Sequence, residues 1–233
     1  KYDEWPPNNA AWQPIYFSDN NGLTFIQERK SKIDFNEYIS DPNDPVPYTS
    51  AIDNGKRMYN RTYMTEDQRF ASKRPDVLTF QTEPLDKDFT IAGPIKVELS
   101  VSTSGTDSDW IVKLIDVFPD SISSDGKDFT GYQMMVRGDI MRGKFRNSLE
   151  NPEPFIPNKP TKVAFIMNDS YHTFLKGHRI MVQVQSSWFP MFDRNPQKSC
   201  DIYSADESDF QSAANRVYHT KEYQSKIILN VIK

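Results

Sequence analysis

Three histidines are the first side chains to consider for chemistry, because a serine hydrolase needs a histidine as its general base. They are His172, His178 and His219, and any Ser-His-Asp triad in this chain would have to use one of them. Hydrolases of the α/β type also hold their serine on a Gly-x-Ser-x-Gly turn, and no such run occurs among the nine glycines. We therefore interpret all three histidines as structural and predict no catalytic residue in this chain.

Two groups of polar side chains could offer oxygen ligands to a calcium ion. The first is Asp41, Asn43 and Asp44, and the second is Asp107 with Asp109. Neither group has the glycine and the bidentate glutamate of a loop built for calcium, so we interpret them as carboxylates that cap turns. The histidines and the single cysteine have no zinc spacing. We predict neither a metal nor another cofactor.

An aromatic cluster near the C-terminal third of the chain is harder to assign to a core. Trp188, Phe189, Met191 and Phe192 place four large apolar side chains within five residues. They cannot all face one core. One interpretation is that they close the end of a β-sandwich, and the other is that they dock another domain or protein. Together with Trp5, they are our candidate docking residues.

The composition limits the kinds of partner and the kind of fold. The 233 residues carry a formal net charge of −4 and no long run of Lys and Arg, which argues against nucleic acid or a membrane surface as a partner. Cys200 is the one cysteine, so an internal disulfide is excluded. No stretch reads as a transmembrane helix or a signal peptide. The length suits one large domain with a real core.

Alternating apolar residues predict that this domain is built of β-strands. In the clearest case, residues 177–185, the side chains of Ile180, Val182 and Val184 fall on one face. Residues 140–146 are predicted as a strand or a single helical turn. The same alternation predicts further strands at 15–17, 23–26, 77–81, 95–101, 110–118, 132–136, 163–167 and 227–231. About eight to ten strands with long connections predict an all-β, jelly-roll (galactose-binding-like) β-sandwich with one or two short helices.

Three segments break the strand pattern. Residues 1–14 contain Trp5, Trp12 and several prolines, and we predict that they form a linker from a missing upstream domain, followed by the sandwich domain at 15–233. Residues 34–71 include the run DPNDPVP and are predicted to be a long loop, because each proline removes a hydrogen-bond donor and restricts its predecessor. Residues 207–214 are predicted to be a short helix.

Three sequence runs carry a resemblance to a known family. Residues 74–120, GDIMRGKFR at 138–146 and FLKGHRIMVQVQSSWFPMFDRNPQ at 174–197 resemble the C-terminal domain of the X-prolyl dipeptidyl-peptidase and cocaine-esterase superfamily of serine hydrolases. DPNDPVP and EDQRF are similar to its α-amino-acid ester hydrolase branch, which is also known as glutaryl cephalosporin acylase. The resemblance covers essentially the whole chain.

The resemblance implies a supporting role. In that family a jelly roll of this kind follows an α/β-hydrolase domain, which holds the Ser, Asp and His of the triad, and a helical cap. It implies that this chain packs on its own missing catalytic and cap domains and is inactive alone. It also implies that the loop after DPNDPVP contributes to the acyl pocket, for which Met58, Tyr59 and Tyr63 are our candidates. For the parent protein it implies a serine esterase, acylase or dipeptidyl-peptidase at a periplasmic or secreted address.

The main alternative is a free-standing module that binds carbohydrate or another ligand, as many jelly rolls do. Such a module would present coplanar, exposed tryptophan or tyrosine rings on a sheet face. A structural or adhesion role without a hydrolase partner is the third hypothesis. The sequence leaves open which substrate the parent enzyme uses and whether the protein forms a homo-oligomer.

Overall fold

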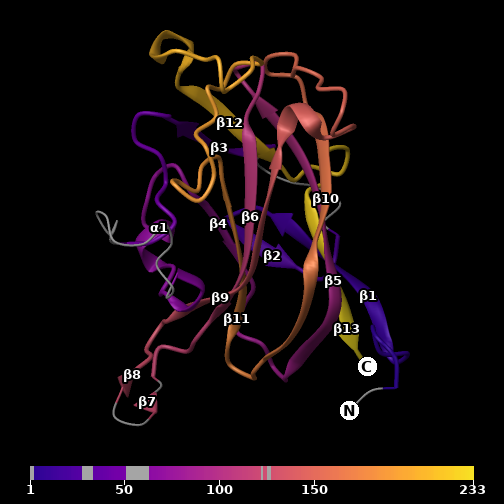
Figure 1. Cartoon of the computed structure of the whole chain (residues 1–233). Coiled ribbons are helices and arrows are strands. Elements are labelled where there is room, and N and C mark those ends of the chain that lie inside the picture. Colours follow the sequence, from indigo (N-terminus) through magenta and orange to yellow (C-terminus); the bar gives the residue numbers. More distant parts are fainter. Residues whose placement is uncertain (1–2, 28–33, 51–62, 122, 125–126) are drawn as a thin grey trace.

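The computed structural model describes residues 3–27, 34–50, 63–121, 123–124 and 127–233, and β-strands dominate it (Figure 1). In chain order the strands are β1 (Ala10–Ser18), β2 (Gly22–Thr24), β3 (Phe35–Ser40), β4 (Leu78–Gln81), β5 (Phe89–Thr103), β6 (Asp109–Val117), β7 (Ser123–Ser124), β8 (Lys127–Asp128), β9 (Gln133–Arg142), β10 (Thr161–Phe174), β11 (Arg179–Gln185), β12 (Ala213–Tyr218) and β13 (Lys226–Ile232). The helical elements in these ranges are α1 (Arg69–Ser72) and the 3-10 turns η1 (Tyr63–Thr65), η2 (Gly143–Phe145) and η3 (Glu207–Asp209). None of these described helices has the length and apolar character needed to cross a bilayer.

The strands form two layers that pack face to face. One layer has the order β9-β6-β11-β4, and the other places β5 between β10 on one side and β13 and β12 on the other. Strands β1 and β2 join the layers at one edge, because β1 pairs with β13 while β2 makes a parallel bridge to β4. The predicted all-β sandwich is confirmed.

The main core lies between the two layers. Leu99 and Val101 of β5 face Val112 and Leu114 of β6, and all four side chains are at most 1% exposed. Burying a side chain of this size stabilises the fold by about 1.5–3 kcal/mol. Strand β6 differs from an ordinary sandwich strand, since its first eight residues are buried on both faces. Its outer face must therefore be covered by another part of the chain.

The predicted helix at 207–214 is wrong. Only Glu207–Asp209 is helical, and the residues that follow form β12, which pairs with β3 and β5. Asp206 starts the turn by accepting a hydrogen bond from the Ser208 amide at 2.8 Å. The turn does not continue, because alternation buries Ala213 and Val217 in the sheet, and tertiary packing outweighs local helix propensity.

Two irregular segments are shorter than predicted. Residues 35–40, part of the predicted loop at 34–71, form the strand β3, which pairs with β12. Its sequence is largely polar, and its buried positions are Tyr38 and Ser40, so an apolar alternation is hard to see. Residues 10–14, the end of the predicted linker, lie in β1 and pair with β13.

Each of the remaining predicted strands overlaps a strand of the structure, although β5 begins six residues before the predicted 95–101 and β10 ends seven residues after the predicted 163–167. The hairpin expected from 15–17 and 23–26 is β1 and β2, and its turn holds Asn20 and Asn21 at φ angles of 58°. Asparagine tolerates this left-handed conformation better than most residues. At 140–146 both predicted alternatives occur in sequence, because β9 continues to Arg142 and η2 follows it.

Candidate functional site

A second apolar cluster covers the outer face of β6 and β9, on the side away from the main core. We call it the outer cluster. Trp188 is 4% exposed, and its ring stacks on that of Phe192 with 5.9 Å between the centroids. The other buried members are Tyr48, Ile111 and Met135, and the half-buried members besides Phe192 are Tyr63, Met64, Ile140 and Met191.

Two segments bring these side chains onto the sheet. Residues 63–72, which we call the covering segment, hold η1 and α1 and lie beside the β6 layer in Figure 1. Residues 186–192 follow β11 directly. Backbone hydrogen bonds join the second segment to residues 46–48. The Phe189 amide donates to the Val46 carbonyl and the Tyr48 amide donates to the Phe189 carbonyl, both at 2.9 Å.

A shallow hollow of about 350 Å³ lies at the exposed side of the outer cluster. Tyr203, which is 87% exposed, stands at its border, and Arg142 and Asp193 supply polar groups. The rest of the lining is Ile140, Phe145, Met191 and Phe192. The hollow could accept an apolar side chain of a partner.

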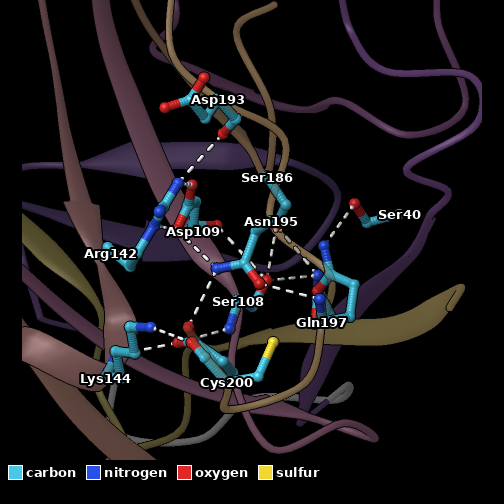
Figure 2. A network of polar contacts seen from close by, with 12 residues as sticks. Ser40, Ser108, Asp109, Arg142, Lys144, Ser186, Asp193, Asn195, Gln197 and Cys200 are labelled. Atoms are coloured by element: carbon cyan, nitrogen blue, oxygen red, sulfur yellow. Dashed lines mark hydrogen bonds and ion pairs between the residues drawn. The ribbon is translucent and has the colours of Figure 1, made fainter. Parts of the chain in front are cut away.

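A buried polar network (Figure 2) shares Arg142 and Asp193 with the lining of this hollow. The Arg142 guanidinium binds Asp109 through both carboxylate oxygens, each at 3.0 Å, and also donates to the Asp193 carbonyl at 3.0 Å. The Asn195 amide donates to Asp109 at 2.7 Å and to Asp107 at 3.2 Å. The network therefore ties the loop that follows Phe192 to β6 and β9.

Burial dominates the electrostatics of the two carboxylates. It raises the pKa of Asp107 to about 6, and the negative charge of Asp109 adds to that rise. Burial also raises the pKa of Asp109, while the Arg142 charge opposes it. Asp107 holds the turn before β6 and the start of η2, because its Oδ1 accepts from the amides of Ser108 and Lys144, each at 2.9 Å.

Sequence reasoning did not predict this network, although its parts come from the three family-like runs. Asp107 and Asp109 are predicted to cap turns. Asp107 does so, whereas for Asp109 the prediction is wrong, because its carboxylate binds Arg142 and Asn195. Asp41 also caps a turn, since its Oδ1 accepts from the Asn43 amide at 2.9 Å. The available signal was two carboxylates, Asp107 just before β6 and Asp109 at its first position, where both are followed by a largely apolar run. Arg142 and Asn195 are too far away in the chain for any local pattern to reveal them as partners.

The structure separates the sequence-predicted site residues into three groups. Met58 and Tyr59 lie outside the described residues. Tyr63 belongs to the outer cluster, where its ring centroid is 5.9 Å from that of Tyr48. Trp5 lies elsewhere and packs against β10. Its ring centroid is 6.3 Å from that of Tyr171, and its indole N–H is bonded to Asp169.

The aromatic run at 188–192 contains one buried side chain and three half-buried ones. Trp188 is buried against β6 and β9 rather than at the end of the sandwich, whereas Phe189, Met191 and Phe192 are half-buried. Trp188 can therefore hold the other side chains in place but offers little surface itself. The docking role stays a prediction, and Met191 and Phe192 are the members of the run that line the hollow.

Two of the histidines share one buried carboxylate. Asp116 is bonded to His172 Nε2 at 2.9 Å and to His178 Nδ1 at 2.7 Å. His219 Nε2 lies 3.0 Å from the Asn36 side-chain oxygen. The contacts found at His172 and His178 within the described ranges lead to this carboxylate and not to a serine hydroxyl. In the same ranges no cluster of three or more His, Cys, Asp and Glu side chains is arranged to hold a metal ion.

Comparison with known proteins finds relatives that are considerably longer. The chain is 32% identical over 237 residues to the cocaine esterase of Rhodococcus sp. (strain MB1 Bresler). The aligned region covers 99% of this chain and 39% of the esterase. It superposes with a TM-score of 0.92 and 39% identity on an aminopeptidase from a marine sediment Thaumarchaeota archaeon, covering 100% of this chain and 38% of the aminopeptidase.

A further structural match is an α-amino-acid ester hydrolase, with a TM-score of 0.88 and 43% identity over 94% of this chain and 36% of the hydrolase. The chain thus spans less than two fifths of each of these relatives. Residues 1–228 match the X-Pro dipeptidyl-peptidase C-terminal non-catalytic domain. Together with the two-layered β fold, this match shows that the chain belongs to the family of X-Pro dipeptidyl-peptidase C-terminal non-catalytic domains.

Proposed function

We propose that this domain packs on the catalytic and cap domains of a serine esterase, acylase or dipeptidyl-peptidase, and that the exposed rim of the outer cluster is its docking face. The observation that carries the proposal is a second apolar core outside the sandwich, several of whose side chains remain half-buried beside an open hollow. Large contiguous apolar surfaces usually mark interaction sites. The aromatic and methionine side chains of this rim are also typical of the centre of protein interfaces.

We also propose that the chain from Tyr48 to Met64 forms a wall of the parent enzyme's acyl pocket. Tyr63 supports this role, because η1 holds its ring at the half-buried side of the outer cluster, next to Tyr48. Met58 and Tyr59 are the other candidates. An apolar wall of this kind would bind the acyl group by burial, leaving bond cleavage to the catalytic domain.

The geometry of the described aromatic residues gives little support to a carbohydrate-binding module. The rings of Trp5 and Tyr171 are tilted by 50° and so form no flat platform. The ring of Trp12 is covered by Lys96, whose Nζ lies 3.8 Å from its centroid. Trp188 is buried, and sugar stacking needs an exposed ring face.

The docking proposal can be tested with one charge on the rim of the parent enzyme. We expect Phe192→Asp to lower kcat/KM at least about tenfold, because a buried unpaired carboxylate costs about 2 kcal/mol or more and weakens domain packing. The matched control is Ile39→Asp, since Ile39 is 54% exposed on β3. Circular dichroism of the 233-residue variants checks that both fold. Equal activity of the two folded variants would contradict the proposal.

The periplasmic or secreted address of the parent protein stays a prediction. The docking face proposed here requires neither this address nor a particular oligomeric state.

A further inference from the structure

Strand β6 carries a lysine on the face that the covering segment closes. Val112 and Leu114 point into the main core, so strand alternation turns Lys113 to the outer face. Lys113 is 0% exposed. Its neighbours across the sheet are Gln183 of β11 and Gly138 of β9. A fully buried lysine without a charged partner is rare and needs an explanation.

The surroundings of Lys113 compensate an ammonium ion only in part, because one neutral hydrogen-bond acceptor and two aromatic rings lie around it in place of a carboxylate. Its Nζ donates to the Gln68 side-chain oxygen at 3.0 Å, and it lies 5.1 Å from the ring centroid of Trp188 and 5.8 Å from that of Phe70. None of the ion pairs found among the described residues involves Lys113. Burial lowers the pKa of Lys113 to about 7, and the charge of Glu66 opposes that shift only partly.

Gln68, the hydrogen-bond partner of Lys113, is one of the residues that fix the covering segment to the sheet, beside Asp67, whose Oδ1 accepts from the Gln133 amide at 3.2 Å. Gln68 is 1% exposed. Its amide donates to the Gln133 carbonyl of β9 at 2.9 Å, its side-chain nitrogen donates to the Glu66 carbonyl at 2.9 Å, and its carbonyl accepts from Ser72 at the end of α1 at 3.0 Å. The contact between Lys113 and Gln68 therefore links β6 to the middle of this segment at Glu66 and to its end at Ser72.

The other charged groups of the covering segment do not compensate Lys113. Asp67 and Arg69 pair with each other at 2.5 Å. Glu66 accepts from the Ser50 amide at 3.1 Å. On the two neighbouring strands, the cross-strand positions are the uncharged Gln183 and Gly138.

We infer that Lys113 is a positioning residue that holds the covering segment, with Tyr63 and Met64, against the sheet while its amine is neutral, and that protonation of this amine releases the segment. The released state places the ammonium in water and leaves the outer cluster without part of its cover. Any change that this release causes in the acyl pocket rests on the function proposed above. The motion of the segment does not depend on that function.

The direction of the pH effect follows from proton binding. The closed state holds Lys113 with a pKa of about 7, whereas an exposed lysine has a pKa of about 10.4. The open state therefore binds the proton more tightly. The opening constant should rise about tenfold for each unit by which the pH falls from about 10 to about 7, and it should level off below that range.

Hydrogen exchange in the 233-residue chain tests this inference without any enzyme assay. Between pH 9 and pH 7 we expect the protection factors of amides in residues 63–72, corrected for intrinsic exchange, to fall about 50-fold. In Lys113→Met the protection factors of these amides should be nearly equal at pH 9 and pH 7. Lys144→Met is the matched control, because Lys144 is also buried but donates to the Cys200 carbonyl in the polar network, and it should behave like the wild type.

A second readout covers the case in which Lys113→Met does not fold. The wild-type chain labelled with fluorotryptophan should show a Trp188 fluorine resonance that titrates with a midpoint above pH 7, since the ring lies 5.1 Å from the amine and opening of the segment favours proton uptake. A Trp188 resonance that is constant between pH 6 and pH 9, or equal protection at both pH values in the wild type, would overturn the inference. Neither result would bear on the docking face.

Discussion

The guanidinium of Arg142 compensates a carboxylate that has almost no contact with water. The Asp109 side chain is 2% exposed, whereas that of Arg142 is 18% exposed. Removing one partner of a buried ion pair leaves an unpaired charge and typically costs about 3–5 kcal/mol. We therefore expect Arg142→Met to lower the free energy of unfolding, measured by urea denaturation, by about that amount.

The control for Arg142 is an exposed ion pair of the same domain. Lys198 binds Asp209 at 2.6 Å at the surface, and Lys198→Met should change the unfolding free energy little, because water screens such pairs. Combining Arg142→Met with Asp109→Leu should restore part of the lost stability, since no buried charge then remains. An Arg142→Met variant as stable as Lys198→Met would show that the network does not hold the loop.

The sequence could identify single residues of the site but not their partners. Asp107 was recognised as a turn carboxylate from its local context. Its neighbours Arg142 and Asn195 could not be assigned, because Arg142 is 33 residues and Asn195 is 86 residues from Asp109 in the chain. Such contacts depend on which strands become neighbours, and local patterns do not carry this information.

Strand β9 can lie close to the outer cluster because it carries a glycine at the point of contact. A Cβ atom at Gly138 would lie 2.9 Å from the Trp188 ring and 3.4 Å from the Lys113 side chain. Overpacking of this kind costs about 1–3 kcal/mol. We expect Gly138→Ala to displace Trp188, lower the unfolding free energy by about that amount and change the Trp188 fluorescence.

An exposed strand position provides the comparison for Gly138. Ala164 lies on β10 with its side chain in solvent, and Ala164→Val should alter the unfolding free energy by no more than about 0.5 kcal/mol. If Gly138→Ala matched Ala164→Val in stability and left the Trp188 fluorescence unchanged, the close packing of β9 on Trp188 would not matter for the fold.

At the scale of elements, strands with apolar alternation could be predicted, and strands without it could not. The alternation in β5, β11 and β13 reflects one face in the main core. β3 and β12 contain more polar residues and are held largely by pairing with each other and with β5. Only one turn of the helix predicted at 207–214 forms, because the length of a helix depends on the neighbouring strands.

The whole molecule combines a β-sandwich with a second apolar layer on one side of it. Two interpretations of residues 188–192 followed from the sequence, closure of the sandwich end and a docking surface, because so many large apolar residues could not share one core. It did not reveal that Trp188 would be buried or that residues 63–72 would cover β6. The proposed docking face is the part of this layer that remains half-buried, near Met191 and Tyr203.

Hydroxyl-radical footprinting tests this docking face most directly. The 233-residue chain and the parent enzyme would be labelled in parallel, and oxidation would be compared at Met191 and Tyr203, with Tyr171 as the control because it is 58% exposed on the other layer. If the face docks the catalytic domain, Met191 and Tyr203 will be protected several-fold in the parent enzyme and Tyr171 will not. Equal oxidation of Met191 and Tyr203 in both proteins would contradict the proposed docking face.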